Sequence, residues 1–399
     1  MSGTRRKPGR MGPHIDGFRD WLLERGYTPG SVRQILKLVG HLGRWMANAD
    51  LNVSQLNETV TAMFLDTVRA RGTRRVPGVR SLRPLLEYLG AQCALTAQVA
   101  PGTPLEQFLG HYRAWLVDER GLAGPTVIRY ENLARRFLSR QAPSQGGGLV
   151  EGLTAADVVA FLLRESARVS VGATKGRVAE LRSLLRFLHL KGLTPTALAS
   201  AVPPVAGWHD TGIPIGLTAA DVQRLLDCCD HSNTGGTRDF AILMIVARLG
   251  LRSAEVARLE LDDIDWRGGE IVVRGKARRR DRLPLPADVG QALAAYVRDA
   301  RAATSTRRVF LTLKAPRRAI RPDLVSDVTR RACQRAGLPP VGAHRLRHTL
   351  ATEMLRRGAK LVEVSQVLRH RDLATTAIYA KVDLNNLRSI TLPWPGGLR

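Results

Sequence analysis

The chain has 399 residues, 44% of them hydrophobic, which is enough for two or three domains that each bury a core. Its formal net charge of +26 and its isoelectric point near 11.2 exceed what solubility requires and favour a polyanionic partner, with nucleic acid the leading candidate. The start of the chain is basic without an apolar stretch behind it, and no later segment approaches about 18 uninterrupted apolar residues, so we expect neither a signal peptide nor a membrane span.

The cysteines are few and lack the spaced pairs that staple a secreted domain; they are Cys93, Cys228, Cys229 and Cys333. A reducing bacterial cytoplasm fits best, with association to the nucleoid if DNA is the partner. Residues 1–13 form a basic segment that we expect to be a flexible tail, with a DNA-contacting arm as the alternative.

A repeat covers the first half of the chain. Residues 15–46 run parallel to residues 109–139, about 95 positions later. Each copy has a tryptophan, then an Arg-Gly step, then Ser31 or Thr126, which we expect to open a second helix. Apolar residues recur at helical spacing through both copies. The pattern predicts tandem bundles of about four helices each, with a flexible loop at 143–148 inside the second.

Prolines and glycines interrupt the helical pattern at 201–216, which indicates an interdomain linker. A new unit starts beyond it, with Thr218 as helix N-cap and Asp221 in the capping-box position. A buried helix then ends at Gly250. The stretch EIVVRGKARRRDRLPLP alternates and turns as a β-hairpin with a basic tip would, and helical patterns return from Ala287. This unit is therefore expected to be mainly helical with a small antiparallel sheet.

We accordingly divide the chain into domains by residue range. The expected order is a basic tail (1–13), an N-terminal helical DNA-binding domain (14–100), a helical core-DNA-binding domain (104–200), a linker (201–216), a catalytic domain (217–383) and a C-terminal tail (384–399).

His344 and His348 have the i, i+4 spacing of a zinc-binding helix, but Arg345 stands where that motif needs a glutamate. Two guanidinium groups beside the histidines, those of Arg345 and Arg347, would repel a divalent cation, so no metal is expected. His344 and Arg347, at i, i+3, instead share one helical face. There the arginine suits a bidentate clamp on phosphate oxygens and the histidine a proton acceptor. Taken alone, such a pair is more often a solvated surface.

Further residues of the same chemical character lie elsewhere in the second half; they are Arg252, Lys276, His370 and Tyr379. A tyrosine hydroxyl has a pKa near ~10, so attack on a phosphodiester at neutral pH needs cationic neighbours or a base. Two arginines and a histidine supply that field and would also stabilise the charge of the transition state. A lysine on a hairpin tip could then protonate the departing sugar oxygen.

The order and spacing of these residues resemble the tyrosine recombinase superfamily of phage integrases, chromosome-dimer resolvases and transposon recombinases. GLRSAEV, with Glu255 three residues after Arg252, is similar to that family's first arginine box, and Lys276 fits its β-hairpin lysine. HRLRHTLAT resembles its His-x-x-Arg box, and His370 followed nine residues later by Tyr379 resembles its final box. The resemblance covers roughly residues 213–385.

Two positions depart from the family pattern. Arg345 stands where the family usually has an acidic residue, and Arg369 stands where it usually has a glycine before the last histidine. The first would add a phosphate contact. The second puts a non-glycine residue at a turn but removes no catalytic group.

The resemblance implies a catalytic set of Arg252, Lys276, His344, Arg347, His370 and Tyr379, without metal or other cofactor. Tyr379 would attack DNA to form a 3′-phosphotyrosyl link, the arginines would clamp the phosphate, Lys276 would act as general acid, His344 as proton acceptor and His370 as hydrogen-bond donor. It also implies SAM-like helical DNA-binding bundles followed by a mixed α+β catalytic domain.

The implied function is site-specific recombination through a Holliday junction, for integration, excision or transposition of a mobile element. The expected partners are double-stranded DNA with specific recombination sites and other copies of the chain in a tetramer, with partner recombinases a further option. Apolar residues of the C-terminal tail would dock on a neighbouring protomer or on the same one. The alternatives are a type IB topoisomerase-like enzyme and a DNA-binding partner that does not cut.

Overall fold

The computed structural model describes residues 9–70, 81–92, 103–140, 150, 152–205, 216–275, 279–370 and 376. It confirms a mainly helical chain with one small antiparallel sheet. The chain divides into two compact units, Ala97–His209 and Met1–Thr96 together with Asp210–Arg399. Among the residues described, no helix combines the length and the apolar content that a membrane crossing requires.

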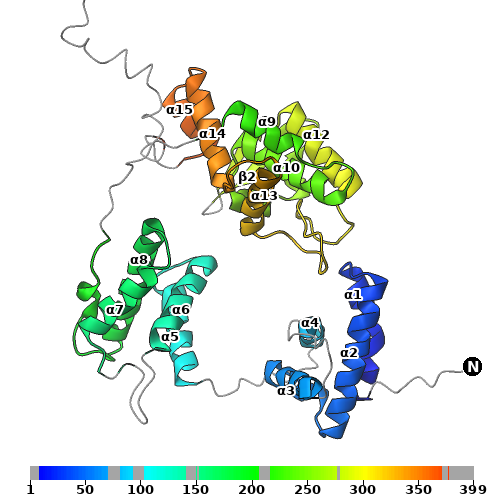
Figure 1. Cartoon of the computed structure of the whole chain (residues 1–399), viewed down its shortest axis with the longest axis vertical. Helices are drawn as coiled ribbons and strands as arrows, with labels where there is room; N and C mark the ends of the chain where they lie inside the picture. Colours follow the sequence, from blue (N-terminus) through cyan, green and yellow to red (C-terminus); the bar gives the residue numbers. More distant parts are fainter. Residues whose placement is uncertain are drawn as a thin grey trace, which may run out of the picture. The chain divides into compact units, whose positions relative to one another are not determined.

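The first copy of the repeat forms helices around its own core (Figure 1). Phe18, Leu42 and Phe64 are buried there. Thr28 accepts a hydrogen bond from the backbone N–H of Ser31, and a proline follows it in the first turn, so the second helix begins before Ser31 and the expected start was wrong. The elements are α1 (Ile15–Glu24), α2 (Pro29–Asn48), α3 (Glu58–Ala70) and α4 (Arg83–Ala91), with short 3₁₀ turns at Gly9–His14 and Val53–Gln55.

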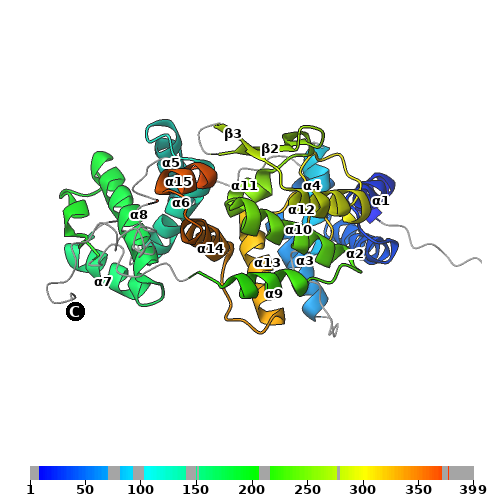
Figure 2. The same cartoon turned by 90° about the horizontal axis from the view of Figure 1, so that it is seen from above.

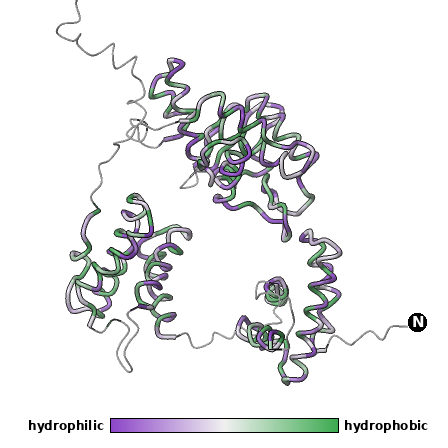
Figure 3. Tube along the Cα trace, viewed as in Figure 1, coloured by the Kyte–Doolittle hydropathy of each residue, from purple (hydrophilic) through white to green (hydrophobic). Residues whose placement is uncertain are grey.

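The second copy also forms four helices, and its core contains Phe137 and Phe161, whose ring centroids lie 5.0 Å apart. Its second helix begins at Gly124 and not at Thr126, again because a proline occupies the first turn. Figure 3 shows hydrophobic and hydrophilic residues alternating along the helices, as amphipathic packing requires. The elements are α5 (Pro104–Asp118), α6 (Gly124–Leu138), α7 (Ala155–Ser166), α8 (Val171–Leu190) and a 3₁₀ turn at Leu198–Ala201.

Three buried glutamates in this second copy hold arginines at its surface. Glu131 accepts hydrogen bonds of 2.8 and 2.7 Å from Arg113, whose side chain stays 60% exposed. Glu180 pairs with Arg129 at 2.6 Å, and Glu165 with an arginine of α6 at 3.0 Å. Because the carboxylates are buried and the guanidinium groups are not, the acids fix the direction of the arginines without neutralising their outer faces.

The C-terminal region, from residue 216 to the last helix described, is built around a helix whose central residues, from Ala241 to Val246, are buried. Thr218 and Asp221 form the expected capping box at the start of this region, and the expected helix stop at Gly250 is also confirmed. The elements are α9 (Ala219–Asp227), the central α10 (Thr234–Leu249), α11 (Ser253–Arg258), α12 (Ala287–Ala295), a π-helical turn (Tyr296–Ala300), α13 (Pro322–Arg335), α14 (Ala343–Arg356) and α15 (Leu361–Leu368), with 3₁₀ turn Leu261–Asp263.

The expected hairpin is present as β2 (Glu270–Arg274) and β3 (Arg280–Pro284), and the short strand β1 (Ile264–Asp265) extends it to a three-stranded antiparallel sheet beside α11 (Figure 2). Ile271 and Val273 are buried, while the alternate residues of β2 face outward. The hairpin closes where the backbone N–H of Gly275 donates to the carbonyl of Arg279 at 2.8 Å.

α10 positions the elements that carry the candidate site. Its side chains Ile242, Leu243 and Ile245 are fully buried, and each such side chain contributes about 1.5–3 kcal/mol relative to an exposed one. Helices α9, α11, α12, α13 and α14 all pack against it. Gly250 ends α10 with a left-handed φ of 59°, which turns the chain sharply into α11.

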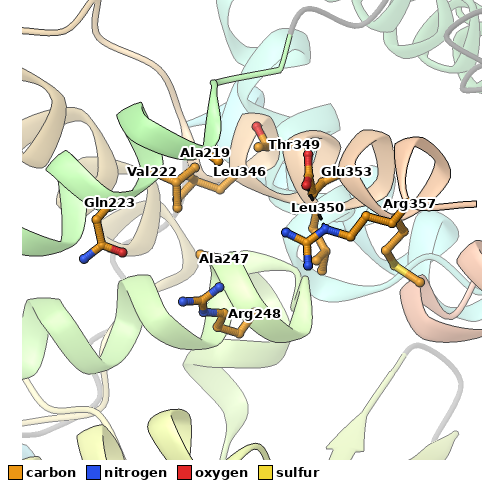
Figure 4. A pocket seen from close by; sticks show the side chains of 11 residues that line it. Ala219, Val222, Gln223, Ala247, Arg248, Leu346, Thr349, Leu350, Glu353 and Arg357 are labelled. Atoms are coloured by element: carbon orange, nitrogen blue, oxygen red, sulfur yellow. Dashed lines mark hydrogen bonds and ion pairs between the residues drawn. The ribbon is translucent and has the colours of Figure 1, made fainter.

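One face of α14 is anchored to the start of this region. Leu346, Thr349 and Leu350 line a hollow that α9 and α10 complete with Val222 and Arg248 (Figure 4). The hydroxyl of Thr349 accepts a hydrogen bond of 2.9 Å from the backbone N–H of Leu217. This contact holds the first described residues after the expected linker against α14.

Several sequence-based expectations lie outside the described residues. They concern the basic tail at 1–8, the loop at 143–148, the linker from 206 to 215, the hairpin tip with Lys276, the candidate nucleophile Tyr379, and the C-terminal tail.

The substitution Gly250→Ala should lower the melting temperature of the full chain more than Gly269→Ala. Both glycines have φ near +60°, at 59° and 63°, where a Cβ costs roughly 1–2 kcal/mol. A Cβ at Gly250 would also lie 2.8 Å from Leu368 and 3.0 Å from Leu350, whereas Gly269 has open space. Thermal unfolding followed by circular dichroism measures the difference, and equal shifts would contradict the packing described at Gly250.

Candidate phosphodiester-cleaving site

Arg252 lies at the turn between α10 and α11. Its backbone N–H donates to Oε2 of Glu255 at 2.9 Å, and its Nη1 donates to Oε1 of the same carboxylate at 2.8 Å. Glu255 is buried, whereas the Arg252 side chain remains 42% exposed. The carboxylate therefore caps α11 and orients the arginine toward solvent with one set of contacts.

His344 and Arg347 lie on the first turns of α14, as their spacing predicts. Arg347 is only 2% exposed. Its Nη1 donates to the carbonyl of Gly250 and its Nη2 to the carbonyl of Leu368. One side chain therefore ties the end of α10 and the end of α15 to α14.

His370 follows the end of α15. Arg369, before it, takes the left-handed conformation with a φ of 54°, and the backbone N–H of His370 donates to the carbonyl of Ser365 at 3.0 Å. Nδ1 of His370 lies 2.7 Å from the hydroxyl oxygen of Thr376, which is buried. If the threonine donates this bond, the proton of a neutral ring sits on Nε2, where it can be donated to a ligand.

These residues come together from segments that are far apart in the sequence. Nη2 of Arg252 donates to the carbonyl of Arg369 at 3.3 Å, which joins the first arginine box to the last histidine. Arg347 and Arg252 both act electrostatically on His344 and on His370. Lys276 and Tyr379 lie outside the described residues, so their places in the site stay predictions.

The site holds its histidines in the neutral form. Desolvation and then the charge of Arg347 lower the pKa of His344, although this residue lies at the surface. Desolvation lowers the pKa of His370 to about 4, with Arg347 and Arg252 adding to the shift. Desolvation, followed by the neighbouring His344, also lowers the pKa of His348 to about 4. A neutral His344 can accept a proton at physiological pH, as a base requires.

Sequence reasoning did not predict the supporting contacts of three residues, which are His348, Thr376 and Arg369. His348 packs its ring edge-on against His344, with centroids 4.3 Å apart and planes at 75°, which steadies the outer histidine. Thr376 orients His370, and Arg369 pairs with Glu255 at 2.9 Å. The signal for Thr376 was its place in the box that contains Tyr379. The contact of His348 with His344 is consistent with their i, i+4 spacing on a helix, whereas the pairing of Arg369 with Glu255 does not follow from local spacing.

The chain is similar to known DNA recombinases over nearly its whole length. Residues 216–386 match the phage integrase family. The chain is 40% identical to the "Putative integrase/recombinase y4rA" of Sinorhizobium fredii, covering 98% of this chain and 97% of that one. It is 29% identical to the tyrosine recombinase XerD of Listeria monocytogenes, covering 72% of this chain and 96% of that one.

Solved structures share the fold. The XerH site-specific recombinase bound to its palindromic difH substrate aligns with a TM-score of 0.50 and 15% identity, covering 96% of this chain and 94% of that one. A lambda integrase dimer bound to a core site aligns with a TM-score of 0.51 and 19% identity, covering 68% of this chain and 96% of the integrase chain.

Two histidines of the full chain, His348 and His370, should titrate near pH 4, well below the ordinary value of 6.5. Because the unfolded chain binds these protons near 6.5 and the folded chain only near 4, the folded state should lose stability as the pH falls between these values. Proton–carbon NMR of histidine-labelled protein measures both titrations. His370→Gln should remove one of them, and titration of both rings near 6.5 would contradict the desolvated site.

Proposed function

The chain belongs to the phage integrase family of tyrosine recombinases, and we propose that Arg252, His344, Arg347 and His370 form the phosphate-binding part of its cleavage site. The single observation that carries this proposal is the convergence of these side chains from α10–α11, α14 and the end of α15. Site-specific DNA recombination is the activity of this family.

The arginines supply the binding energy for the phosphate. Arg252 presents a half-exposed guanidinium, which suits a bidentate contact with non-bridging oxygens. Arg347 is buried, so it contributes its positive charge from the interior, and its hydrogen bond to the carbonyl of Gly250 holds the backbone before Arg252 in place. His370 donates a hydrogen bond through Nε2. Together these groups stabilise the negative charge that builds on phosphorus during transfer.

Tyr379 is the proposed nucleophile and Lys276 the proposed general acid, on the basis of their sequence spacing. The phenolic oxygen forms a bond to phosphorus, its proton passes to His344, and the bond to the 5′ oxygen breaks. Lys276 protonates that oxygen, which leaves as a 5′-hydroxyl. The phosphodiester energy stays in the 3′-phosphotyrosyl link, so a 5′-hydroxyl of another strand reseals the DNA without an external energy source.

Exchange between two DNA duplexes requires more than one active site. We propose a tetramer on paired recombination sites that passes through a Holliday junction, and integration, excision or transposition of a mobile element as the biological outcome. One structural neighbour, the integrase of transposon Tn1549, was solved with a circular intermediate DNA, at a TM-score of 0.51 and 15% identity. We further propose that the protein acts on DNA at the bacterial nucleoid.

The helical regions are proposed to bind the same DNA duplex as the catalytic domain. The surface arginines anchored by Glu131, Glu165 and Glu180 suit contacts with the phosphate backbone. We keep the expected boundaries, with 14–100 and 104–200 as DNA-binding domains and 217–383 as the catalytic domain, as part of this proposal. The first copy of the repeat would then lengthen the grip on the same DNA.

A type IB topoisomerase-like activity would use the same cleavage chemistry, and a non-cutting DNA-binding partner would use only the grip. The helical core-binding region, together with relatives named integrase and recombinase, favours recombination over the topoisomerase-like activity. The four described site residues favour an enzyme over the second.

The variant Tyr379→Phe should form no covalent adduct with DNA, because a phenyl ring has no oxygen to attack phosphorus. The substrate is a set of nicked duplexes tiled across the DNA that flanks the gene, and adducts are detected as protein bands shifted on denaturing gels. The control Tyr130→Phe removes a hydroxyl elsewhere and should keep the adduct. If the unmodified protein forms none on any duplex, the cleavage proposal fails.

DNA affinity should fall steeply with salt. A protein with about 6–10 phosphate contacts loses about 10³- to 10⁵-fold in affinity between roughly 50 and 200 mM salt. Fluorescence anisotropy on the same duplexes measures the slope, and a flat response would argue against a grip on the DNA backbone.

A further inference from the structure

Arg369 occupies a position where its side chain is not expected. Its φ of 54° is the left-handed conformation that glycine adopts without strain and that an L side chain rarely takes. The residue is also only 6% exposed, so a guanidinium group has been taken out of water. Strain and desolvation both oppose an arginine here, which indicates that the side chain has a function.

The guanidinium of Arg369 forms a buried ion pair. Its Nη2 lies 2.9 Å from Oε2 of Glu255, and the two side chains are only 3% and 5% exposed. Its Nη1 donates to the carbonyl of Val367 at 2.9 Å, which fixes the side chain against its own helix. The pair joins the end of α15 to the first turn of α11.

Arg369 also contacts Arg252 directly. The carbonyl of Arg369 accepts a hydrogen bond of 3.3 Å from Nη2 of Arg252, while the Glu255 carboxylate accepts from Nη1 of Arg252 at 2.8 Å. Arg252 is thus held at both of its terminal nitrogens by groups that Arg369 positions. A glycine at 369 would keep the carbonyl but lose the ion pair.

We infer that Arg369 is a positioning residue for DNA cleavage: through Glu255 and through its own carbonyl, it holds the Arg252 guanidinium in the orientation that binds the scissile phosphate. This inference rests on the proposed function of Arg252. It assigns a role to the residue by which this chain departs from the usual family pattern.

Charge sharing explains why a second cation is needed. With Arg252 as its only partner, the buried Glu255 carboxylate would neutralise the arginine that must bind a phosphate. Arg369 supplies a second positive charge, so the group of two guanidiniums and one carboxylate keeps a net charge of one. Burial would raise the pKa of Glu255, but Arg369 and then the contacts from Arg252 reverse this and lower it. The carboxylate stays ionised and keeps its hold on both arginines.

The experiment compares variants of the full chain in covalent-adduct formation on nicked duplexes from the DNA that flanks the gene. Arg369→Gln and Arg369→Gly remove the charge, and Gly also removes the backbone strain. Arg369→Lys keeps the charge. We expect at least about a tenfold slower adduct formation for Gln and Gly, because misplacing a catalytic group by about 1 Å costs up to 10²-fold, and partial recovery for Lys. Arg298→Ala, which removes an exposed charge paired with its neighbour Asp299, is the control and should react as the parent does.

A double-variant cycle tests whether Arg369 acts through Glu255. If it does, Arg369→Gln combined with Glu255→Gln should react at about the rate of Glu255→Gln alone, because residues that act as a unit are not additive. Fully additive losses would overturn the inference, and so would parental rates in both Arg369→Gln and Arg369→Gly.

The pH profile separates positioning from a structural contact. Among the described residues, the charged groups that act on Glu255 are Arg252, which precedes α11, and Arg369 at the end of α15. Arg369 also adds to the lowering of the His370 pKa, after desolvation and the other two arginines. Loss of the Arg369 charge raises the pKa values of Glu255 and His370. The acidic limit, the pH below which the cleavage rate falls, should therefore be higher in Arg369→Gln and Arg369→Gly than in the parent, and unchanged in Arg369→Lys. An unchanged limit in well-folded variants, as judged by thermal melting, would count against the inference. If the parent itself forms no adduct, the proposed function has failed and not this inference.

Discussion

The buried guanidinium of Arg347 joins the elements that make up the site. Its Nη1 and Nη2 donate to carbonyls at the ends of α10 and α15, where helices leave acceptors without internal partners. Each such helix end carries about half a negative elementary charge. Two such ends offset about one positive charge, which explains how an arginine that is 2% exposed is tolerated. Because Gly250 and Leu368 each precede a site residue by two positions, the same contacts place Arg252 and His370.

The electrostatic character of the site follows from this arrangement. Arg252 and Arg369 share the buried carboxylate of Glu255, and together with Arg347 they act electrostatically on His370, so positive charge exceeds negative charge among these residues. Desolvation, and then these positive charges, lower the pKa values of His344 and His370, so both histidines are neutral at physiological pH. The excess positive charges repel one another until an anion binds. A bound phosphodiester relieves this repulsion, so the charges that destabilise the free protein stabilise the DNA-bound state and the transition state of cleavage.

Local features of the fold were predictable because they depend on neighbours in sequence. The capping box of Thr218 and Asp221, the stop at Gly250 and the hairpin at 270–284 all follow from short patterns. The starts of α2 and α6 were wrong because a proline in the first turn extends each helix beyond Ser31 and Thr126 toward the N-terminus. The shared helical face of His344 and Arg347 was predicted correctly. Lys276 and Tyr379 remain assigned by spacing alone.

By itself, the sequence determined the chemistry available to this protein: the residue types, their order along the chain, and the helices and hairpin that carry them. Only the tertiary structure decided which of these groups share an environment. Arg369 illustrates the difference, since its sequence position suggested only a strained turn, while its ion pair lies 114 residues away at Glu255. Contacts of this kind depend on how α11, α14 and α15 pack against α10. Packing is a property of the whole buried surface, which no short pattern in the sequence encodes.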